Sequence, residues 1–199
     1  MTTTISAKDV KELRDRTGAG MMECKAALTE SNGNMENAID ILRARGAAKA
    51  AKRAEREARE GTVASYIHMG GKIGVLVELN CETDFVAKTE QFQELARLIA
   101  LHIAAANPTG VSREQIQADV VERERGVYRE QMRESGKPEK IWDKIIEGKL
   151  EKFYAESTLL EQPFVKNPDQ TVGQLITEVS GKTGEKIEVR RFTRYALGE

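Results

Sequence analysis

Residues 78–88, Glu-Leu-Asn-Cys-Glu-Thr-Asp-Phe-Val-Ala-Lys, carry the side chains best suited to act on another surface. An apolar strand at 73–79 leads into a polar turn, and Asp84 and Phe85 then stand side by side at the start of a helix. Strand-to-helix junctions often hold functional residues, because a rigid sheet positions the loop. A negative charge beside a large aromatic ring is suited to separating the elements of a partner. The alternative is that Thr83 or Asp84 caps the helix while Phe85 covers the core.

The other candidates for chemistry, two histidines and two cysteines, form no recognisable site. His68 and His102 fall in different elements without acidic or cysteine neighbours, so we expect polar packing residues. Cys24 and Cys81 lack the spacing of zinc ligands and are too few for a disulfide framework, so we expect reduced, buried thiols. Neither a phosphate-binding loop nor a nucleophile elbow occurs in the sequence. The sequence therefore predicts a binding protein that is not an enzyme and needs no cofactor or metal.

Composition argues against several classes of function. The 199 residues include 31 basic and 32 acidic side chains, so a net charge of −1 attracts neither nucleic acid nor membrane. Aromatic residues make up 5% and charged residues 32%, which together with abundant alanine indicates a helix-rich protein. No segment approaches the roughly 20 apolar residues of a membrane span, and the N-terminal residues lack the features of a signal or transit peptide. We therefore expect a cytoplasmic protein without direct contact to nucleic acid or membrane.

Residues 5–45 are expected to form three short amphipathic helices. Ser6 can cap the first helix, Thr17-Gly18-Ala19-Gly20 separates it from the second, and Gly46 is expected to end the third. The expected buried residues are Val10 and Leu13, then Met21, Cys24, Ala27 and Leu28, then Met35, Ala38, Ile39 and Leu42. A bundle of this size is too small for a deep catalytic pocket, and such bundles usually bind other proteins.

Residues 47–60 have no apolar face beyond alanine, which predicts a charged helical linker. Opposite charges recur four residues apart in the pairs Arg53–Glu57, Glu55–Arg59 and Arg56–Glu60. A nucleic-acid-binding arm is the alternative for this segment. Five basic residues against three acidic ones, with no aromatic side chain to stack on bases, favour a solvated spacer instead.

From Gly61 the apolar period changes from 3.6 to 2, which predicts that the rest of the chain contains a sheet. The expected elements are a β-hairpin at 62–79, a long helix that ends at Asn107-Pro108, a helical hairpin of 113–134 and 139–156, a helix at 171–183 and a final strand at 186–195. The predicted fold class is α+β, with a three-helix bundle at 1–46, a linker at 47–60 and a core at 61–199. In that core a three-stranded antiparallel sheet packs with helices, and the helical hairpin precedes the final helix and strand.

The chain resembles bacterial translation elongation factor Ts, the guanine-nucleotide exchange factor for elongation factor Tu, over nearly its whole length. The matching motifs are Leu13–Lys25 (LRDRTGAGMMECK), Asn80–Ala87 (NCETDFVA), Ser135–Pro138 (SGKP), Gln162–Val165 (QPFV) and Arg190–Tyr195 (RRFTRY). Several long motifs in one order are far more specific than any single pattern.

The resemblance implies a role for each part of the chain. The N-terminal bundle would be a ubiquitin-associated-like domain that docks on the nucleotide-binding domain of elongation factor Tu, in its GDP-bound and nucleotide-free states. A second segment would intrude into that partner, disturb its Mg²⁺ and phosphate site and promote GDP release. The residues implied are Leu13, Met21 and Met22 for docking, and Thr83, Asp84, Phe85 and Val86 for intrusion.

Longer members of this family carry two copies of the hairpin segment, whereas only Gly61–Leu79 has that pattern here. A lone three-stranded sheet would expose an apolar face, and exposed apolar faces mark interfaces. The residues expected on that face are Val63, Val75, Val77, Ile187 and Val189. We therefore expect a homodimer in which two sheets pack across a two-fold axis.

An alternative function remains open for the N-terminal bundle. Three-helix bundles of this kind also bind ubiquitin-like proteins or nascent chains without any exchange activity. That function would leave the adjacent Asp84 and Phe85 unexplained.

Overall fold

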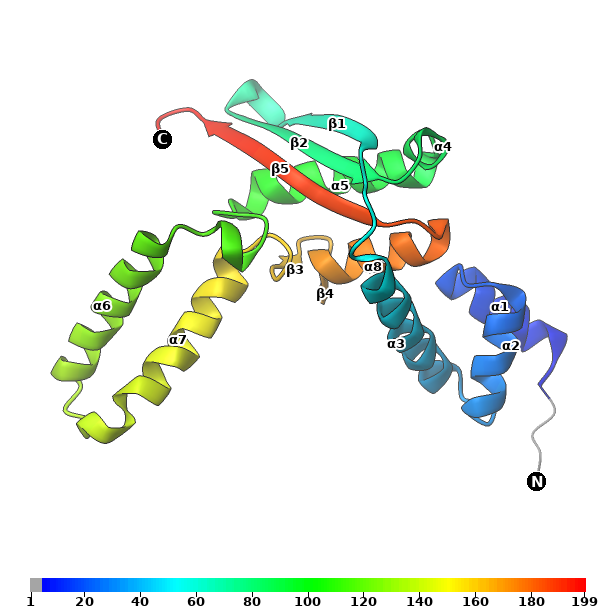
Figure 1. The fold of residues 1–199 in the computed structure, drawn as a ribbon, viewed down its shortest axis with the longest axis horizontal. Helices are drawn as coiled ribbons and strands as arrows, with labels where there is room; N and C mark the ends of the chain where they lie inside the picture. Colours follow the sequence, from blue (N-terminus) through cyan, green and yellow to red (C-terminus); the bar gives the residue numbers. More distant parts are fainter. Residues whose placement is uncertain (1–4) are drawn as a thin grey trace. The chain divides into compact units, whose positions relative to one another are not determined.

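The computed structural model describes residues 5–199, except for the side chain of Met69. Its helices are α1 (Ala7–Thr17), α2 (Met21–Glu30), α3 (Met35–Arg53), α4 (Asp84–Ala87), α5 (Glu90–Ala106), α6 (Ala118–Glu134), α7 (Trp142–Ser157) and α8 (Val172–Thr183) (Figure 1). Its strands are β1 (Glu60–Ile67), β2 (Ile73–Cys81), β3 (Pro163–Phe164), β4 (Asn167–Thr171) and β5 (Ile187–Ala196). The fold is α+β, as the sequence predicted.

The first three helices form the expected bundle. Ser6 caps α1, because its hydroxyl accepts a hydrogen bond from the Asp9 N–H at 3.1 Å and the Asp9 carboxylate accepts one from the Ser6 N–H at 3.3 Å. Gly18 ends α1 with φ +68°, a left-handed conformation that glycine adopts without strain. The buried cluster consists of Val10, Leu13, Cys24, Ala27, Leu28 and Ala38. Apolar burial therefore stabilises the bundle from inside.

Two expectations for this region are wrong. Met21 does not belong to the buried face of α2, since 53% of its surface is exposed. Gly46 does not end the third helix, because α3 continues to Arg53. The segment that follows Gly46 is rich in alanine, lysine and arginine, which favour helix strongly enough to offset one interior glycine.

The linker is accordingly helical only in its first half. Beyond Arg53 the chain is not helical, so a spacing of four residues no longer brings opposite charges together there. Instead Arg56 pairs with Glu82 at 3.3 Å and Arg59 pairs with Glu57 at 2.9 Å. The second half of the linker is thus joined to residues distant in sequence through Arg56, whereas the Arg59–Glu57 pair is local.

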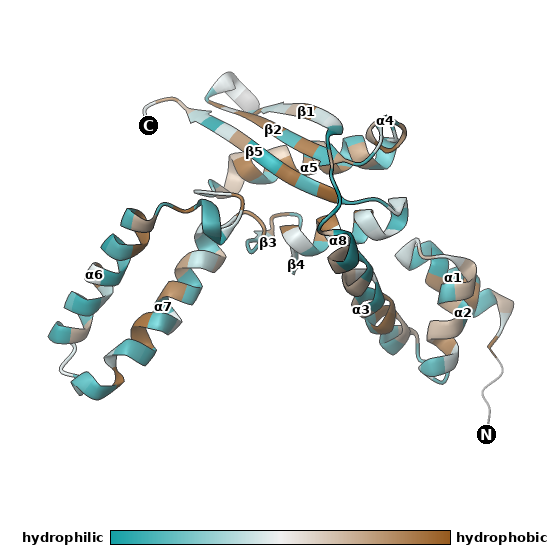
Figure 2. Cartoon of the chain, in the orientation of Figure 1, coloured by the Kyte–Doolittle hydropathy of each residue, from teal (hydrophilic) through white to brown (hydrophobic). Residues whose placement is uncertain are grey.

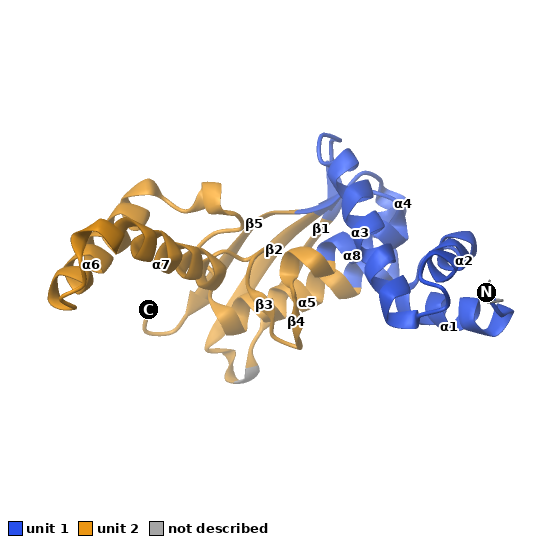
Figure 3. Cartoon of the chain, turned by 90° about the horizontal axis from the view of Figure 1, so that it is seen from below, with its two compact units in different colours: residues 1–61, 80–93, 176–188 blue, residues 62–79, 94–175, 189–199 orange. Residues whose placement is uncertain are grey.

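The residues cluster into two compact units (Figure 3). Unit 1 contains the chain up to Gly61 together with residues 80–93 and 176–188, and unit 2 contains residues 62–79, 94–175 and 189–199. The division at residues 46 and 60 that the sequence suggests stays a prediction, and each unit is described below by itself.

The main sheet is antiparallel with strand order β1-β2-β5. The hairpin between β1 and β2 closes through Gly70 and Gly71, which have φ values of +82° and +70°, and the His68 N–H donates to the Ile73 carbonyl at 2.9 Å. In unit 2, α5 lies along one face of this sheet (Figures 1 and 3). Figure 2 shows hydrophobic stretches along β2 and α5, in keeping with that packing.

The apolar face expected to mediate dimerisation is mostly covered within the chain. Val75, Val77, Ile187 and Val189 are buried, whereas Val63 is 66% exposed. The prediction that these five side chains form one exposed patch is therefore wrong. It fails because four of the five side chains are already buried within a single chain.

The helical hairpin of α6 and α7 forms as the sequence predicted, around a small cluster of Met132, Ile146 and Leu150. Its first helix begins at Ala118 rather than at residue 113, because residues 113–115 form a 3-10 turn. In this turn the Arg113 guanidinium donates two hydrogen bonds to each of two carboxylates, at 2.6 Å to Glu161 and at 2.8 and 2.9 Å to Glu151. These carboxylates raise the pKa of Arg113, so the group stays charged.

The short pair of strands β3 and β4 was not predicted, since β3 has only two residues and β4, with the sequence NPDQT, has no apolar alternation. Next to it lies His102, which is fully buried. Its Nε2 lies 2.9 Å from Oε1 of Gln162, and its Nδ1 accepts the Val165 N–H at 3.3 Å. Burial lowers the pKa of His102, so the neutral ring is favoured. The prediction of a polar packing residue is confirmed for His102.

Candidate functional site

Phe85 projects from a single turn of helix that directly follows the sheet. Strand β2 ends at Cys81, residues 82–83 form a short link, and α4 begins at Asp84. Thr83 caps α4, as its hydroxyl accepts the Val86 N–H at 3.4 Å. Phe85 is 80% exposed, so the alternative in which its ring covers the core is excluded. We call Thr83–Val86 the tip.

The other members of the tip differ in exposure. Thr83, Asp84 and Val86 are half-buried, and Ala87, the residue that follows, is buried. The Asp84 carboxylate accepts a hydrogen bond from Lys88 Nζ at 2.6 Å. This bond lowers the pKa of Asp84 below its ordinary value, so the carboxylate is charged at neutral pH. The structure thus brings the predicted charge and ring together on one short element.

The base of the tip is held by a carboxylate that the sequence did not single out. Glu185 Oε2 accepts the N–H groups of Glu82 and Thr83 at 3.1 and 3.0 Å, and its Oε1 accepts the Thr83 hydroxyl at 2.6 Å. In return the Glu82 carboxylate accepts the N–H of Lys186 at 2.6 Å. These partners lie more than 100 residues apart in sequence, so no local spacing could have indicated them.

Cys81, immediately before this link, is a buried free thiol. Its Sγ donates to the Thr83 carbonyl at 3.2 Å. Burial, and to a lesser degree the negative charge of Glu185, raise the pKa of Cys81 to about 11. The thiol therefore stays protonated at neutral pH, which suits a packing role and not a nucleophile. Cys24 is likewise buried and free, as the sequence predicted.

The N-terminal bundle presents a second candidate surface, formed by exposed methionines of α2. Met21 and Met22 are 53% and 76% exposed. Around Met22 lies a hollow lined also by Lys25, Ala26, Thr29 and Glu30. We call these six residues the docking surface.

The prediction that Leu13 contributes its side chain to the docking surface is wrong. Leu13 is fully buried in the core cluster of the bundle. The match to a family motif cannot separate residues that touch a partner from residues that support those that do. Leu13 is part of the buried core of the bundle and not of its exposed surface.

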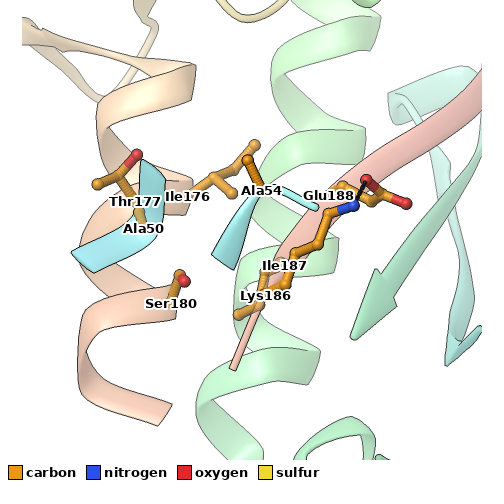
Figure 4. Close-up of a pocket in the computed structure, with 8 residues that line it drawn as sticks. All are labelled: Ala50, Ala54, Ile176, Thr177, Ser180, Lys186, Ile187 and Glu188. Atoms are coloured by element: carbon orange, nitrogen blue, oxygen red, sulfur yellow. Dashed lines mark ion pairs between the residues drawn. The ribbon is translucent and has the colours of Figure 1, made fainter. Parts of the chain in front are cut away.

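A separate hollow of about 250 Å³ lies in unit 1 (Figure 4). It is lined by Ala50, Ala54, Ile176, Thr177, Ser180, Lys186, Ile187 and Glu188. Lys186 and Glu188 form an ion pair at 2.7 Å, and the Ser180 hydroxyl donates to the Glu185 carbonyl at 2.5 Å. Because these polar groups are engaged within the chain, we assign no ligand to this hollow.

Within residues 5–199 no three His, Cys, Asp or Glu side chains are grouped so that they could hold a metal ion. No helix in that range has the length and apolar character needed to cross a membrane.

The chain is similar to known proteins over almost its full length. Residues 3–199 match the family described as "Elongation factor TS". The protein named "Elongation factor Ts" from Desulfosudis oleivorans is 60% identical over 196 residues, covering 98% of this chain and 99% of the relative. Its namesakes from Syntrophus aciditrophicus and Thermosipho melanesiensis are each 59% identical over 195 residues, covering 98% of this chain and 97% and 100% of the relatives.

Proposed function

Because the chain belongs to the elongation factor Ts family and is thus a translation elongation factor, we propose that it is the guanine-nucleotide exchange factor of elongation factor Tu. It binds that partner in the GDP-bound and nucleotide-free states and acts in the cytoplasm, where translation elongation takes place. Exchange forms no covalent bond and requires no cofactor from this chain. Direct contact with nucleic acid or membrane is not part of this function.

The observation that carries the proposal is the exposed ring of Phe85 beside the charged Asp84 on a fixed turn of helix. A GTPase holds GDP through its phosphate contacts and Mg²⁺, so nucleotide affinity falls when that shell is disturbed. The ring of Phe85 is suited to wedge between elements of the partner, and the Asp84 carboxylate to unsettle the polar groups near the ion. The ring is 80% exposed, so its apolar surface is available for such a contact.

Release follows from binding without any chemical step. A factor that binds the nucleotide-free form more tightly than the GDP-bound form lowers the affinity for GDP by the same ratio, because the two binding equilibria are linked. Thr83 and Val86 support the wedge, since Thr83 caps the turn and Val86 donates its N–H to that cap.

The docking surface supplies the second contact. Met21 and Met22 are exposed on α2, and methionine side chains adapt readily to an irregular partner surface. Their backbone is fixed by the buried cluster around Leu13. We therefore place the nucleotide-binding domain of elongation factor Tu on Met21, Met22 and their neighbours, with Leu13 as internal support.

Homodimerisation is also proposed, but through the outer face of the sheet. Exposed apolar side chains on β1 and β2 are Val63, Ile67 and Leu76. A β-carbon placed on Gly74 would lie 3.2 Å from Cδ1 of Ile67, so the Ile67 side chain lies on the face of the sheet to which Gly74 points. Leu76, two residues further along β2, points to that same face. Light scattering should report about twice the chain mass of 22.1 kDa, and Leu76→Glu should reduce it. A strictly monomeric wild-type protein that exchanges nucleotide at full rate would remove the dimer from this account.

The direct test is the release of fluorescent GDP from purified elongation factor Tu with and without this protein. We expect release to accelerate with protein concentration until it saturates. Unstimulated release, combined with binding to ubiquitin-like proteins or ribosomes in the absence of elongation factor Tu, would instead favour the alternative binding module.

A further inference from the structure

We propose that Glu185 is a positioning residue for nucleotide exchange: it fixes the link from which the tip projects and so sets the direction of the Phe85 ring. The inference rests on the proposed function and adds a residue outside the tip. Glu185 lies between the end of α8 and the start of β5, and it is half-buried. The question is what holds the tip in place.

The tip cannot be fixed by its own packing. Helix α4 has four residues, and Ala87 is its only buried one. An isolated helix of this length is unstable, because a single turn does not recover the entropy lost on forming it. The Phe85 ring lies mostly in water, so core contacts do not orient it either. Its direction therefore comes from the backbone on both sides: after the tip, Gln93 Nε2 donates to the Ala87 carbonyl at 2.7 Å, and before it lies the link of Glu82 and Thr83.

Glu185 binds both backbone N–H groups of the link that precedes the tip. Strand β2 ends at Cys81 and α4 begins at Asp84, so Glu82 and Thr83 are the whole link. Both of their N–H groups donate to one oxygen of Glu185, at 3.1 and 3.0 Å. Hydrogen bonds to a charged acceptor are stronger than those between neutral groups. The carboxylate therefore fixes the link at two successive peptide groups.

The other oxygen of Glu185 controls the helix cap. Thr83 has a single hydroxyl hydrogen, which it donates to Glu185 Oε1 at 2.6 Å. A lone pair of the Thr83 hydroxyl oxygen accepts the Val86 N–H at 3.4 Å. Since one hydroxyl makes both bonds, Glu185 selects the Thr83 orientation in which α4 is capped.

The segment that carries Glu185 is itself fastened from the other side. The Glu82 carboxylate accepts the N–H of Lys186 at 2.6 Å and bonds from Arg56 Nη1 at 3.3 Å, while Lys186 Nζ donates to the Arg56 carbonyl at 3.0 Å. Glu82 and Glu185 thus bind each other's neighbouring backbone, and we call this arrangement the carboxylate clamp. All of its members lie in unit 1 (blue in Figure 3).

The test compares Glu185→Ala and Glu185→Gln with the wild-type protein in the GDP-release assay. We expect Glu185→Ala to lower the maximal stimulated rate about ten-fold, as for loss of hydrogen bonds to a charged group, with a smaller change in the concentration giving half-maximal rate. Glu185→Gln retains one acceptor oxygen and should recover part of that rate. The matched control is Glu178→Ala on α8, whose carboxylate pairs with Lys182 at 2.6 Å and should leave the rate unchanged.

A double-mutant cycle with Phe85→Ala separates positioning from general weakening. If Glu185 acts through the ring, Glu185→Ala should cause little further loss in the Phe85→Ala background. Amide hydrogen exchange of the free protein gives a second measure that does not depend on the partner. Peptides covering residues 82–88 should exchange faster in Glu185→Ala than in wild type, and the Glu178→Ala control should match wild type.

The outcomes distinguish this inference from the proposed function. Unchanged release with Phe85→Ala overturns the wedge itself. If Phe85→Ala slows GDP release but a folded Glu185→Ala variant releases GDP at the wild-type rate, only the positioning role is overturned. The same holds if Glu185→Ala lowers the rate equally in the wild-type and Phe85→Ala backgrounds. If Glu185→Ala does not fold, Glu185→Gln takes its place in the same double-mutant cycle. A wild-type rate of GDP release together with wild-type amide hydrogen exchange in Glu185→Gln would contradict the inference.

Discussion

The tip and the docking surface both expose apolar side chains, but the protein supports them in different ways. Met21 and Met22 stand on a bundle with six buried residues at its centre. Phe85 stands on one turn of helix whose only buried residue is Ala87, tied to the chain by the carboxylate clamp. Packing holds one surface and charge-assisted hydrogen bonds hold the other.

This difference indicates a division of work. A surface supported by packing keeps its shape when a single polar group is substituted. Such a surface is suited to binding a partner. An element held by a few directed bonds has a defined orientation but depends on each of them, which suits one geometric task such as wedging. We therefore expect substitutions at the docking surface to alter binding and substitutions at the tip to alter the maximal exchange rate.

The largest effect on stability is expected for Leu13→Ala. This residue is fully buried, and such truncations destabilise by about 2–5 kcal/mol because they leave a cavity. Urea unfolding followed by circular dichroism measures the loss, and Met22→Ala is the matched control because its side chain is exposed. An unaltered free energy of unfolding in Leu13→Ala would show that packing does not support the docking surface.

The next effect concerns the charge at the tip. Asp84→Ala should reduce the maximal stimulated rate of GDP release roughly ten-fold, because the carboxylate no longer disturbs polar groups of the partner. Thermal stability should hardly change. Lys88→Met, which removes the ion-pair partner but keeps the carboxylate, serves as the control. Equal rates for Asp84→Ala and wild type would leave the wedge to Phe85 alone.

A smaller effect is expected for Met22→Ala. Loss of one adaptable contact should weaken binding to elongation factor Tu about five-fold, near 1 kcal/mol, while the maximal exchange rate stays the same. Titration calorimetry with nucleotide-free elongation factor Tu measures the affinity. Leu197→Ala, a change at an exposed apolar residue that belongs to neither surface, should bind like wild type. A lower maximal rate with unchanged affinity would reverse the division of work.

The smallest effect is a pH dependence of the free energy of unfolding. It arises from the buried His102, which belongs neither to the tip nor to the docking surface. Burial holds the pKa of His102 below its ordinary value of 6.5, so the unfolded chain takes up a proton before the folded protein does. The contribution to stability is therefore complete above pH 6.5 and is lost as the pH falls through the lowered pKa. Urea midpoints between pH 8 and 5 should fall more steeply for wild type than for His102→Gln. Parallel curves would contradict this assignment.

Local patterns predicted most elements because their causes are local. The cap at Ser6, the hairpin at 62–79 and the apolar period of the helices depend on residues close together in sequence. The continuation of α3 through Gly46 was not predicted, because glycine commonly ends a helix. The helix-favouring residues that follow it offset the cost of this one glycine.

The site was predictable only in part. The tip could be predicted from the residue types at one strand-to-helix junction, and the exposure of Phe85 agrees with a role as a wedge. The clamp was beyond prediction, because Glu185 meets Thr83 across 102 positions and only the fold brings them together. Leu13 shows a different limit: a family motif indicates that a residue matters, but it does not tell whether its side chain is buried in the core or exposed to a partner.

The most direct test of the account measures fluorescent GDP release from elongation factor Tu at saturating wild-type protein and at saturating Phe85→Ala, with thermal unfolding of both. The account predicts release at least about 30-fold slower for Phe85→Ala, equivalent to some 2 kcal/mol at an interface hot spot. The unfolding transition should be unchanged, because the ring is exposed. Release at the wild-type rate, or a loss of about 3–5 kcal/mol in stability as for a buried aromatic residue, would contradict it.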